Sequence, residues 1–190
     1  MKYSLRTLFE VDKILEGSQK RKPKKVPIKT VLYCDMDGVL CDFQSRFEHL
    51  TGLHPREYEA KYGKNNFWKF IDETVGEVFW SEMDWTPSGK KLWEFIGKYS
   101  PSLLTSPSRN EVSRTGKQKW VTKNLSPTPK IYFRYSQEKK ELATPITILI
   151  DDRKDIIDSW KKTGGIGIHH PENTRNISPI IEKLKELGYE

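Results

Sequence analysis

The sequence has no long apolar segment, near its N-terminus or elsewhere. Its 190 residues are 35% hydrophobic, and no stretch approaches the roughly 18 consecutive apolar residues that a membrane-spanning helix needs. The N-terminal segment carries acids and has no continuous apolar core, so a secretory signal is not expected. We therefore expect a cytoplasmic protein without a membrane partner.

Cysteine and histidine are too scarce for a metal site built on sulfur or imidazole. The two cysteines, Cys34 and Cys41, flank an acidic motif, and no set of cysteines and histidines has zinc spacing. Reduced thiols are the simplest interpretation. The sequence also lacks internal repeats and low-complexity tracts, and its length predicts one domain with room for a small insertion.

Negative charge is in deficit, and the excess of positive charge is partly concentrated near the N-terminus. The net charge is +7, and a basic block at residues 19–25 follows an amphipathic pattern at 4–16 that predicts a helix. Two interpretations stay open for the block: a solvated linker, which is favoured, or a weak contact with nucleic acid. We assign residues 1–29 to this helix and linker and residues 30–190 to the folded domain.

Short apolar segments that alternate with helical patterns predict an α/β fold with a Rossmann-like, mostly parallel sheet and helices on both faces. Strands are expected at 30–34, 102–104, 130–133, 146–150 and 165–168. Helices are expected at 90–99, 111–124 and 178–187. Residues 44–86 are polar, helical and dense in aromatic side chains, which predicts a small helical cap inserted after the first strand.

Polar residues follow three of these strands at the point where each ends: Asp35 and Asp37, Thr105 and Ser106, and Asp151 and Asp152. Ligands of open α/β sheets bind beyond the carboxyl ends of the strands, so the topology predicts that the three pairs meet. Four carboxylates close together need a cation to stay ionised, and an oxygen-only set suits Mg²⁺. Gly38 allows a sharp turn directly after the first pair.

These motifs resemble those of the haloacid dehalogenase superfamily of phosphohydrolases, and within it those of the 5'(3')-deoxyribonucleotidases. The resemblance spans residues 30 to about 170 and is carried by DMDGVLCDF at 35–43, LTSP at 104–107, KQKWV at 117–121 and LIDDR at 149–153. It implies a Mg²⁺-dependent phosphoric monoester hydrolase that acts on a small nucleotide.

The resemblance also implies roles for the acidic residues. Asp35 would be the nucleophile that forms an aspartyl-phosphate, and Asp37 would protonate the leaving alcohol and then activate water. The metal ligands would be Asp35, the backbone carbonyl of Asp37, and Asp152. Asp151 would orient a lysine or a metal-bound water.

Thr105, Ser106 and a lysine would hold the phosphate. Lys117 matches one lysine of the family. A second stands in the family about ten residues before the acidic pair, after an Asp. This chain has Lys139 and Lys140 there, after Glu138 and one or two residues farther from the pair. We favour Lys140.

The aromatic residues of the cap have two interpretations. In the deoxyribonucleotidases a helical cap covers the site and aromatic rings sandwich the base; Phe43 matches one of them, and Phe67 with Trp68 resembles the Phe–Trp pair. Stacking of a base is worth about 1 to 3 kcal/mol. The other interpretation is that the aromatics form the core of the cap, which we favour for Phe47, Phe70 and Phe79 and leave open for Phe43 and Trp68.

Two other functions stay open. A phosphatase of DNA or RNA ends would share the chemistry, and the basic block favours it, whereas a closed aromatic cap does not. An interaction protein that uses the basic arm would need no carboxylates at the sheet edge. His169 and His170 follow a strand, and we interpret them as loop residues with ordinary partners. The oligomeric state stays open.

Overall fold

The computed structural model describes residues 30–190. The expected helix at 4–16 and the basic block at 19–25 lie outside the described residues. Within them, no helix is long and apolar enough to cross a membrane.

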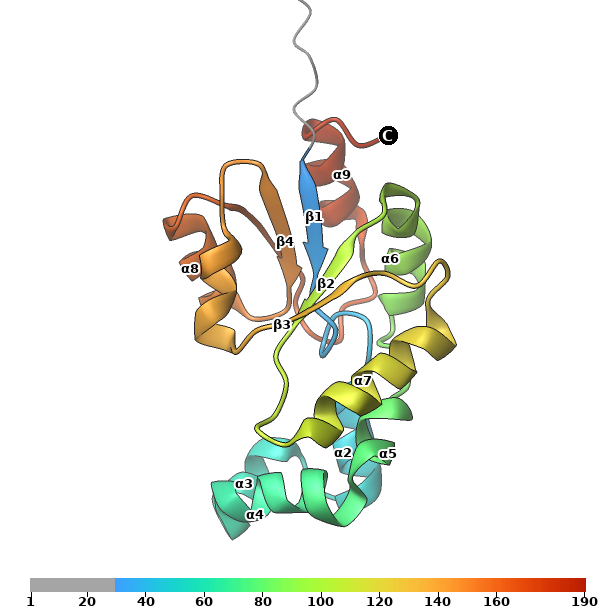
Figure 1. The fold of residues 1–190 in the computed structure, drawn as a ribbon, viewed down its shortest axis with the longest axis vertical. Helices are drawn as coiled ribbons and strands as arrows, with labels where there is room; N and C mark the ends of the chain where they lie inside the picture. Colours follow the sequence, from blue (N-terminus) through green and yellow to red (C-terminus); the bar gives the residue numbers. More distant parts are fainter. Residues whose placement is uncertain (1–29) are drawn as a thin grey trace, which may run out of the picture.

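A five-stranded, all-parallel sheet forms the centre of the structure (Figure 1). Its order is β3-β2-β1-β4-β5. The strands are β1 (Val31–Cys34), β2 (Ser102–Thr105), β3 (Ile131–Phe133), β4 (Thr147–Asp151) and β5 (Ile166–His169). The predicted α/β class with a parallel sheet is therefore confirmed, and both ends of every strand lie within one residue of the expected positions.

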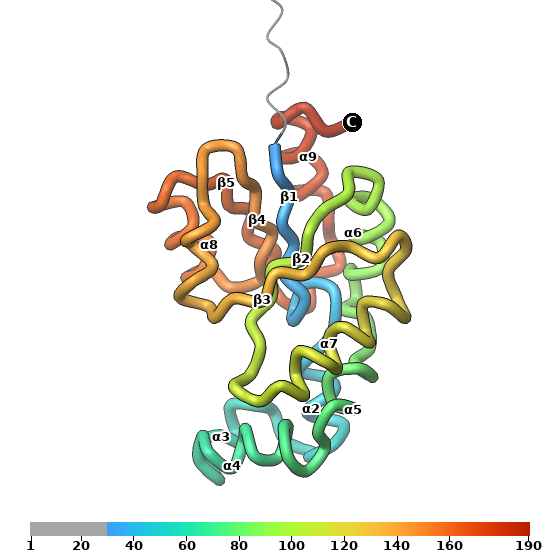
Figure 2. Tube along the Cα trace, viewed as in Figure 1, coloured from blue at the N-terminus to red at the C-terminus, as the bar shows by residue number. Residues whose placement is uncertain are grey.

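Side chains alternate between the two faces of the sheet, and each face is covered by helices. In β1, Leu32 and Cys34 join a large apolar cluster with helices α6 (Gly89–Ile96), α7 (Glu111–Asn124) and α9 (Ser178–Glu186). Tyr33 points the other way and packs with Trp160 of α8 (Lys154–Lys162). Figure 2 shows α8 and α9 on opposite sides of β1 and β4. Helix α8 was not among the expected elements.

Short helical turns complete the connections. A 3₁₀ turn, η2 (Gly97–Tyr99), extends α6 so that together they fill the helix predicted at 90–99. A second, η3 (Ser136–Leu142), precedes β4 and packs beside α8. Sequence reasoning placed no helix at η3.

The helical insertion after β1 is present and stands below the carboxyl ends of the strands in Figure 1. It consists of α2 (Phe43–Thr51), α3 (Pro55–Tyr62), α4 (Lys64–Lys69), the π-helical turn η1 (Phe70–Val75) and α5 (Glu77–Ser81). Asp42 caps α2 by accepting a hydrogen bond from the Ser45 backbone N–H, and Gly52 ends it in a left-handed conformation. We call this insertion the cap.

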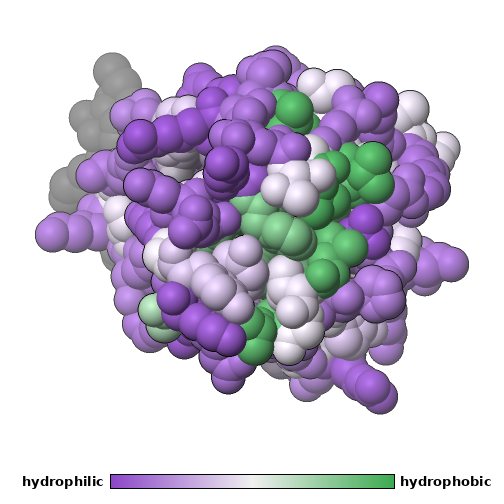
Figure 3. Space-filling view, turned by 90° about the horizontal axis from the view of Figure 1, so that it is seen from below, coloured by the Kyte–Doolittle hydropathy of each residue, from purple (hydrophilic) through white to green (hydrophobic). Residues whose placement is uncertain are grey.

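The cap is tied to the sheet where the chain leaves and re-enters the core. The Asp42 N–H donates to the Asp84 carbonyl at 2.8 Å, and the Thr86 N–H donates to the Leu40 carbonyl at 2.9 Å. Seen from the cap end, a group of apolar side chains interrupts an otherwise hydrophilic face (Figure 3). Among the described residues of the cap, Leu50 and Val78 are large, exposed and apolar.

Candidate active site

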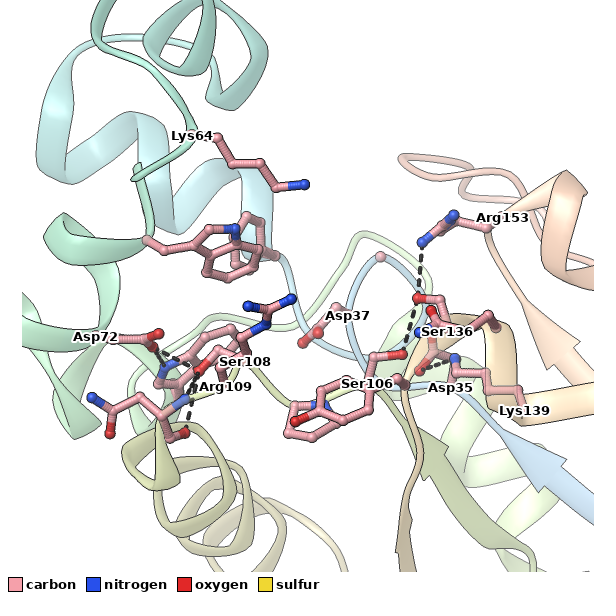
Figure 4. Close-up of a pocket in the computed structure, with 18 of the residues that line it drawn as sticks. Asp35, Asp37, Lys64, Asp72, Ser106, Ser108, Arg109, Ser136, Lys139 and Arg153 are labelled. Carbon is pink, nitrogen blue, oxygen red and sulfur yellow. Dashed lines mark hydrogen bonds and ion pairs between the residues drawn. The ribbon is translucent and has the colours of Figure 1, made fainter. Parts of the chain in front are cut away.

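Polar residues at the ends of three neighbouring strands meet at one edge of the sheet. Asp35 directly follows β1 and donates its backbone N–H to the Ile150 carbonyl of β4 at 2.9 Å. Asp151 is the last residue of β4, and Ser106 follows β2. The edge faces a cavity of about 1450 Å³, whose other walls come from the cap and from the segment after β3 (Figure 4).

A buried lysine joins two of the carboxylates. Lys139, in η3, is 2% exposed. Its Nζ lies 2.8 Å from Asp151 Oδ2 and 3.0 Å from Asp35 Oδ1. Burial alone would lower the pKa of Lys139, but the carboxylates of Asp35 and Asp151 raise it well above its ordinary value. Lys139 is therefore a fixed cation beside Asp35.

The structure brings Lys139, and not the favoured Lys140, to the carboxylates. Lys140 is exposed, whereas its neighbour reaches the site. In a 3₁₀ turn consecutive side chains point about 120° apart, so only one of two adjacent lysines can face the sheet edge. Sequence spacing did not show which one.

Three carboxylates form a cluster that fits a divalent cation. Asp35, Asp151 and Asp152 each offer an oxygen within 4.8 Å of the others. Burial, and then the charge of Asp35, raises the pKa of Asp151 to about 6 and that of Asp152 to about 8. Asp35 Oδ1 is buried and makes no hydrogen bond with the described residues, although the ammonium of Lys139 is near. Oxygen ligands that carry excess negative charge match the requirements of a hard cation.

A glycine makes room for this cluster. Gly38 has φ +75°, a conformation that side-chain-bearing residues rarely adopt, and a Cβ there would lie 2.7 Å from Asp152 Oδ2. Any other residue here would have a strained backbone and would push the Asp152 side chain out of its place.

Asp37 is held by a second buried lysine. Lys117 Nζ donates to Asp37 Oδ2 at 2.6 Å, to Thr105 Oγ1 at 2.7 Å and to the Ser106 carbonyl at 2.8 Å. All three ammonium hydrogens are thus used, and Asp37 itself lines the cavity. Lys117 and Thr105 are fully buried and do not line the cavity, so the phosphate contacts expected of these two side chains are not supported. Lys117 holds the Asp37 carboxylate in place, and Thr105 helps to hold Lys117.

Ser106 belongs to a polar chain on the sheet side of the cavity. Its Oγ lies 3.2 Å from Ser136 Oγ, which accepts a hydrogen bond from Arg153 Nη1 at 3.0 Å (Figure 4). Sequence reasoning missed both partners. Arg153 directly follows the acidic pair, which was the available signal; Ser136 had none, because it comes from η3.

The aromatic residues divide between the cavity and the cap core. Phe43 and Trp68 line the cavity, as does Trp80. Phe67 does not: it is 6% exposed, and its ring centroid lies 4.9 Å from that of Phe47. Adjacent residues of a helix point about 100° apart, so Phe67 faces inward while Trp68 faces the cavity. The expected base contact of Phe67 is therefore not supported by its place in the structure.

The cap also supplies charged residues that sequence reasoning missed. Lys64 and Lys69 line the cavity together with Arg109, which lies after β2. Figure 4 shows the side chains of Lys64 and Arg109 reaching into the space opposite Arg153. In the described part of the chain, neither Lys64, Lys69 nor Arg109 makes an ion pair. One buried acid of the cap, Asp72, lines the same space.

The remaining candidates have structural partners. His170 is buried with its Nε2 2.9 Å from Ser88 Oγ, and His169 Nε2 lies 2.8 Å from the Asp152 carbonyl. Cys34 and Cys41 are free, and burial raises the pKa of both thiols well above the ordinary value. Neither thiol is therefore a reactive nucleophile at neutral pH.

Comparisons with known proteins rest on structure. No protein-family model matches the chain, and no curated protein matches it. A haloacid dehalogenase-like family hydrolase from Xanthomonas campestris superposes with a TM-score of 0.53 at 10% identity, over 83% of this chain and 91% of that one. The chain has the haloacid dehalogenase-like fold.

Two further structures with this fold are similar at lower scores. A HAD family enzyme from Bacteroides thetaiotaomicron, in a magnesium complex, has a TM-score of 0.46 and 16% identity, over 80% of this chain and 98% of that one. A HAD-superfamily hydrolase from Ehrlichia chaffeensis has a TM-score of 0.47 and 14% identity, over 84% and 98%. The predicted haloacid dehalogenase-like architecture is confirmed; the likeness to deoxyribonucleotidases stays a prediction.

Proposed function

We propose that this protein is a Mg²⁺-dependent phosphomonoesterase that hydrolyses a deoxynucleoside monophosphate through an aspartyl-phosphate on Asp35. One observation carries the proposal. Asp35 stands at the end of a buried strand, between the ammonium of Lys139 and the carboxylates of Asp151 and Asp152, and faces a cavity lined by Asp37. This is the arrangement that phosphoryl transfer needs: a nucleophile, fixed positive charge and a nearby proton donor.

The metal would be held by Asp35, Asp151 and Asp152. When bound, Mg²⁺ supplies positive charge that neutralises the phosphate and the nucleophile together. In this fold a HAD family enzyme from Bacteroides thetaiotaomicron is known as a magnesium complex, which agrees with the choice of cation.

In the first half of the reaction, a carboxylate oxygen of Asp35 attacks phosphorus. The bond from phosphorus to the leaving oxygen breaks, and Asp37 in its protonated form gives its proton to that oxygen. Lys139 and Ser106 stand on the sheet side, where they can meet the phosphate oxygens, and Lys117 fixes the direction of the Asp37 carboxylate.

In the second half, Asp37 is a carboxylate and accepts a proton from water as the water oxygen attacks phosphorus. The bond between phosphorus and Asp35 breaks, which releases inorganic phosphate and restores the Asp35 carboxylate. Asp37 ends with the proton that it needs for the next turnover. The two halves are balanced without any further reactant.

The cap side of the cavity supports a nucleotide as the leaving group. The faces or edges of Phe43, Trp68 and Trp80 line it, and a flat base that stacks on such rings gains about 1 to 3 kcal/mol. A sugar phosphate has no aromatic ring with which to stack on these side chains.

A phosphate-release screen tests the proposal. Deoxynucleoside and ribonucleoside monophosphates, sugar phosphates and p-nitrophenyl phosphate are compared in Mg²⁺ and in EDTA. We expect release only with Mg²⁺ and the highest kcat/KM with a deoxynucleotide. Hydrolysis of sugar phosphates in preference to every nucleotide would contradict the substrate, and full activity in EDTA would contradict the cofactor.

A second candidate, a phosphatase of polynucleotide ends, is favoured by the size and charge of the cavity. Its volume of about 1450 Å³ exceeds the roughly 300 to 1000 Å³ of ordinary small-molecule pockets. Lys64, Lys69 and Arg109 could meet additional phosphates. Adding 5'-phosphorylated oligonucleotides to the screen decides between the two: a higher kcat/KM for oligonucleotides than for mononucleotides would favour the second candidate.

A further inference from the structure

Asp72 is a buried carboxylate in a place where a phosphatase has no general need of one. It lies in the π-helical turn η1 of the cap, is 8% exposed and lines the cavity across from the sheet edge (Figure 4). Negative charge there repels a phosphorylated substrate. A buried acid in an anion's cavity therefore needs either a structural or a recognition role.

One oxygen of Asp72 is fully used by the protein. Ser108 Oγ donates to Asp72 Oδ1 at 2.9 Å, and Trp80 Nε1 donates to the same oxygen at 3.3 Å. These two bonds come from two different segments, the loop after β2 and helix α5, so they fix the direction of the carboxylate. The cap is joined to the loop of Ser108 through this oxygen.

The other oxygen has no partner in the described part of the chain. No hydrogen bond reaches Asp72 Oδ2, and no lysine or arginine there makes an ion pair with the carboxylate, although Lys64 and Arg109 line the same cavity. Asp72 lines the cavity, so a donor on a ligand can reach this oxygen, and a hydrogen bond to a charged acceptor is worth about 1.5 to 3 kcal/mol.

The neighbours of Asp72 are flat rings. Trp68 precedes it by four residues, so both can present to the same side of this helical segment, and both line the cavity. Trp80, which donates to Asp72, lies with its ring centroid 5.7 Å from that of Phe43. A planar ligand among these rings would bring its edge to Asp72.

We propose that Asp72 Oδ2 accepts a hydrogen bond from a ring or exocyclic N–H on the leaving group, so that the site selects nucleobases that present an N–H donor edge. This assignment rests on the proposed nucleotidase function and adds the feature of the base that is recognised. It makes Asp72 a specificity-determining residue of the cap rather than a participant in the phosphate chemistry.

Matched substrate pairs test the assignment. Thymidine 5'-monophosphate is compared with its N3-methyl derivative, and deoxyadenosine 5'-monophosphate with the purine deoxyriboside 5'-monophosphate that lacks the amino group. We expect the wild type to prefer the member with the N–H donor in at least one pair by about 10- to 100-fold in kcat/KM, the factor expected when a charged acceptor loses its donor.

Asp72→Asn separates recognition from structure. The amide keeps an oxygen that can accept from Ser108 and Trp80, and it replaces the free oxygen with an NH₂ group that donates. We expect the preference within the affected pair to fall to near unity, and p-nitrophenyl phosphate is assayed alongside. Glu59→Gln is the matched control, because it removes the same charge from an exposed side chain of the cap that does not line the cavity; it should keep the preference.

The outcomes distinguish this assignment from the function on which it rests. If the wild type hydrolyses nucleotides but shows no preference in either pair, or if Asp72→Asn lowers both members of a pair by one factor, Asp72 only joins the cap to the core and the assignment is overturned. If the wild type hydrolyses p-nitrophenyl phosphate and favours no nucleotide, the nucleotidase proposal fails and this assignment fails with it.

Discussion

Replacing Lys139 by methionine should disable the site and destabilise the protein, whereas the same change at Lys140 should do neither. Lys139 is the buried cation between Asp35 and Asp151, and methionine preserves much of its length while removing the charge. Lys140, its neighbour, is exposed. The pair therefore compares an interior and a surface lysine in a single turn.

The structure sets the magnitude. Removing one partner of a buried ion pair costs about 3 to 5 kcal/mol, because the remaining charge stays buried and unpaired. In a chain of this size that corresponds to a fall in melting temperature of about 6 to 20 °C. An exposed lysine changes stability by about 0.5 kcal/mol or less. Loss of a fixed charge that stabilises the transition state should lower kcat by about 10²- to 10³-fold.

Thermal unfolding and phosphate release are measured for both variants, each in EDTA and in Mg²⁺. In the Lys139→Met variant, a bound Mg²⁺ can neutralise the carboxylates that have lost the lysine. Mg²⁺ should therefore recover part of the loss in melting temperature but not the turnover. If Lys140→Met loses activity and Lys139→Met melts and reacts as the wild type does, the placement of Lys139 in the site is refuted.

Three further results are expected. Trp68→Ala should lower kcat/KM for nucleotides by about 5- to 150-fold and that for p-nitrophenyl phosphate far less; equal losses would make Trp68 a residue of the cap core. Without divalent cations, the free energy of unfolding should fall as pH rises from about 4 to 8. The pKa values of Asp151 and Asp152 are about 6 and about 8 in the folded protein but near 3.8 in the unfolded chain, so these protons favour the folded state and are lost as pH rises. A melting temperature in EDTA that rises across this range would contradict the raised pKa values. Gly38→Ala, whose Cβ would meet Asp152 Oδ2, should raise the Mg²⁺ concentration for half-maximal activity by about 10- to 100-fold, and an unchanged Mg²⁺ titration would count against the cluster.

The sequence was informative where local pattern and topology act together. Each strand is a short apolar segment, and parallel strands must place their carboxyl ends at one edge of the sheet. The sequence therefore predicted that Asp35 and Asp151 lie close together. Helix α7 begins after the capping Asn110, whose side chain accepts from the Val112 N–H, and spans the residues predicted for it. Helix α8 was missed because only three of its nine side chains are both apolar and buried.

The sequence was less informative about which of two adjacent residues faces the site. The rotation of a helical turn about its axis decides which of two adjacent side chains faces the site, and tertiary packing sets that rotation. This applies to the pair Lys139 and Lys140 and to the pair Phe67 and Trp68. Asp72 could not be singled out at all. It is one acid among 26 acidic residues, and only the approach of groups from two other segments shows that it is buried.

The most direct test of the proposed chemistry compares phosphate release by the wild type and by Asp35→Asn with saturating Mg²⁺ and a deoxynucleoside monophosphate. The amide is close to the carboxylate in shape but cannot form the aspartyl-phosphate, so turnover should fall by at least about 10³-fold, or roughly 4 kcal/mol of barrier, while circular dichroism stays that of the folded protein. Wild-type rates from a folded Asp35→Asn variant would contradict nucleophilic attack by Asp35.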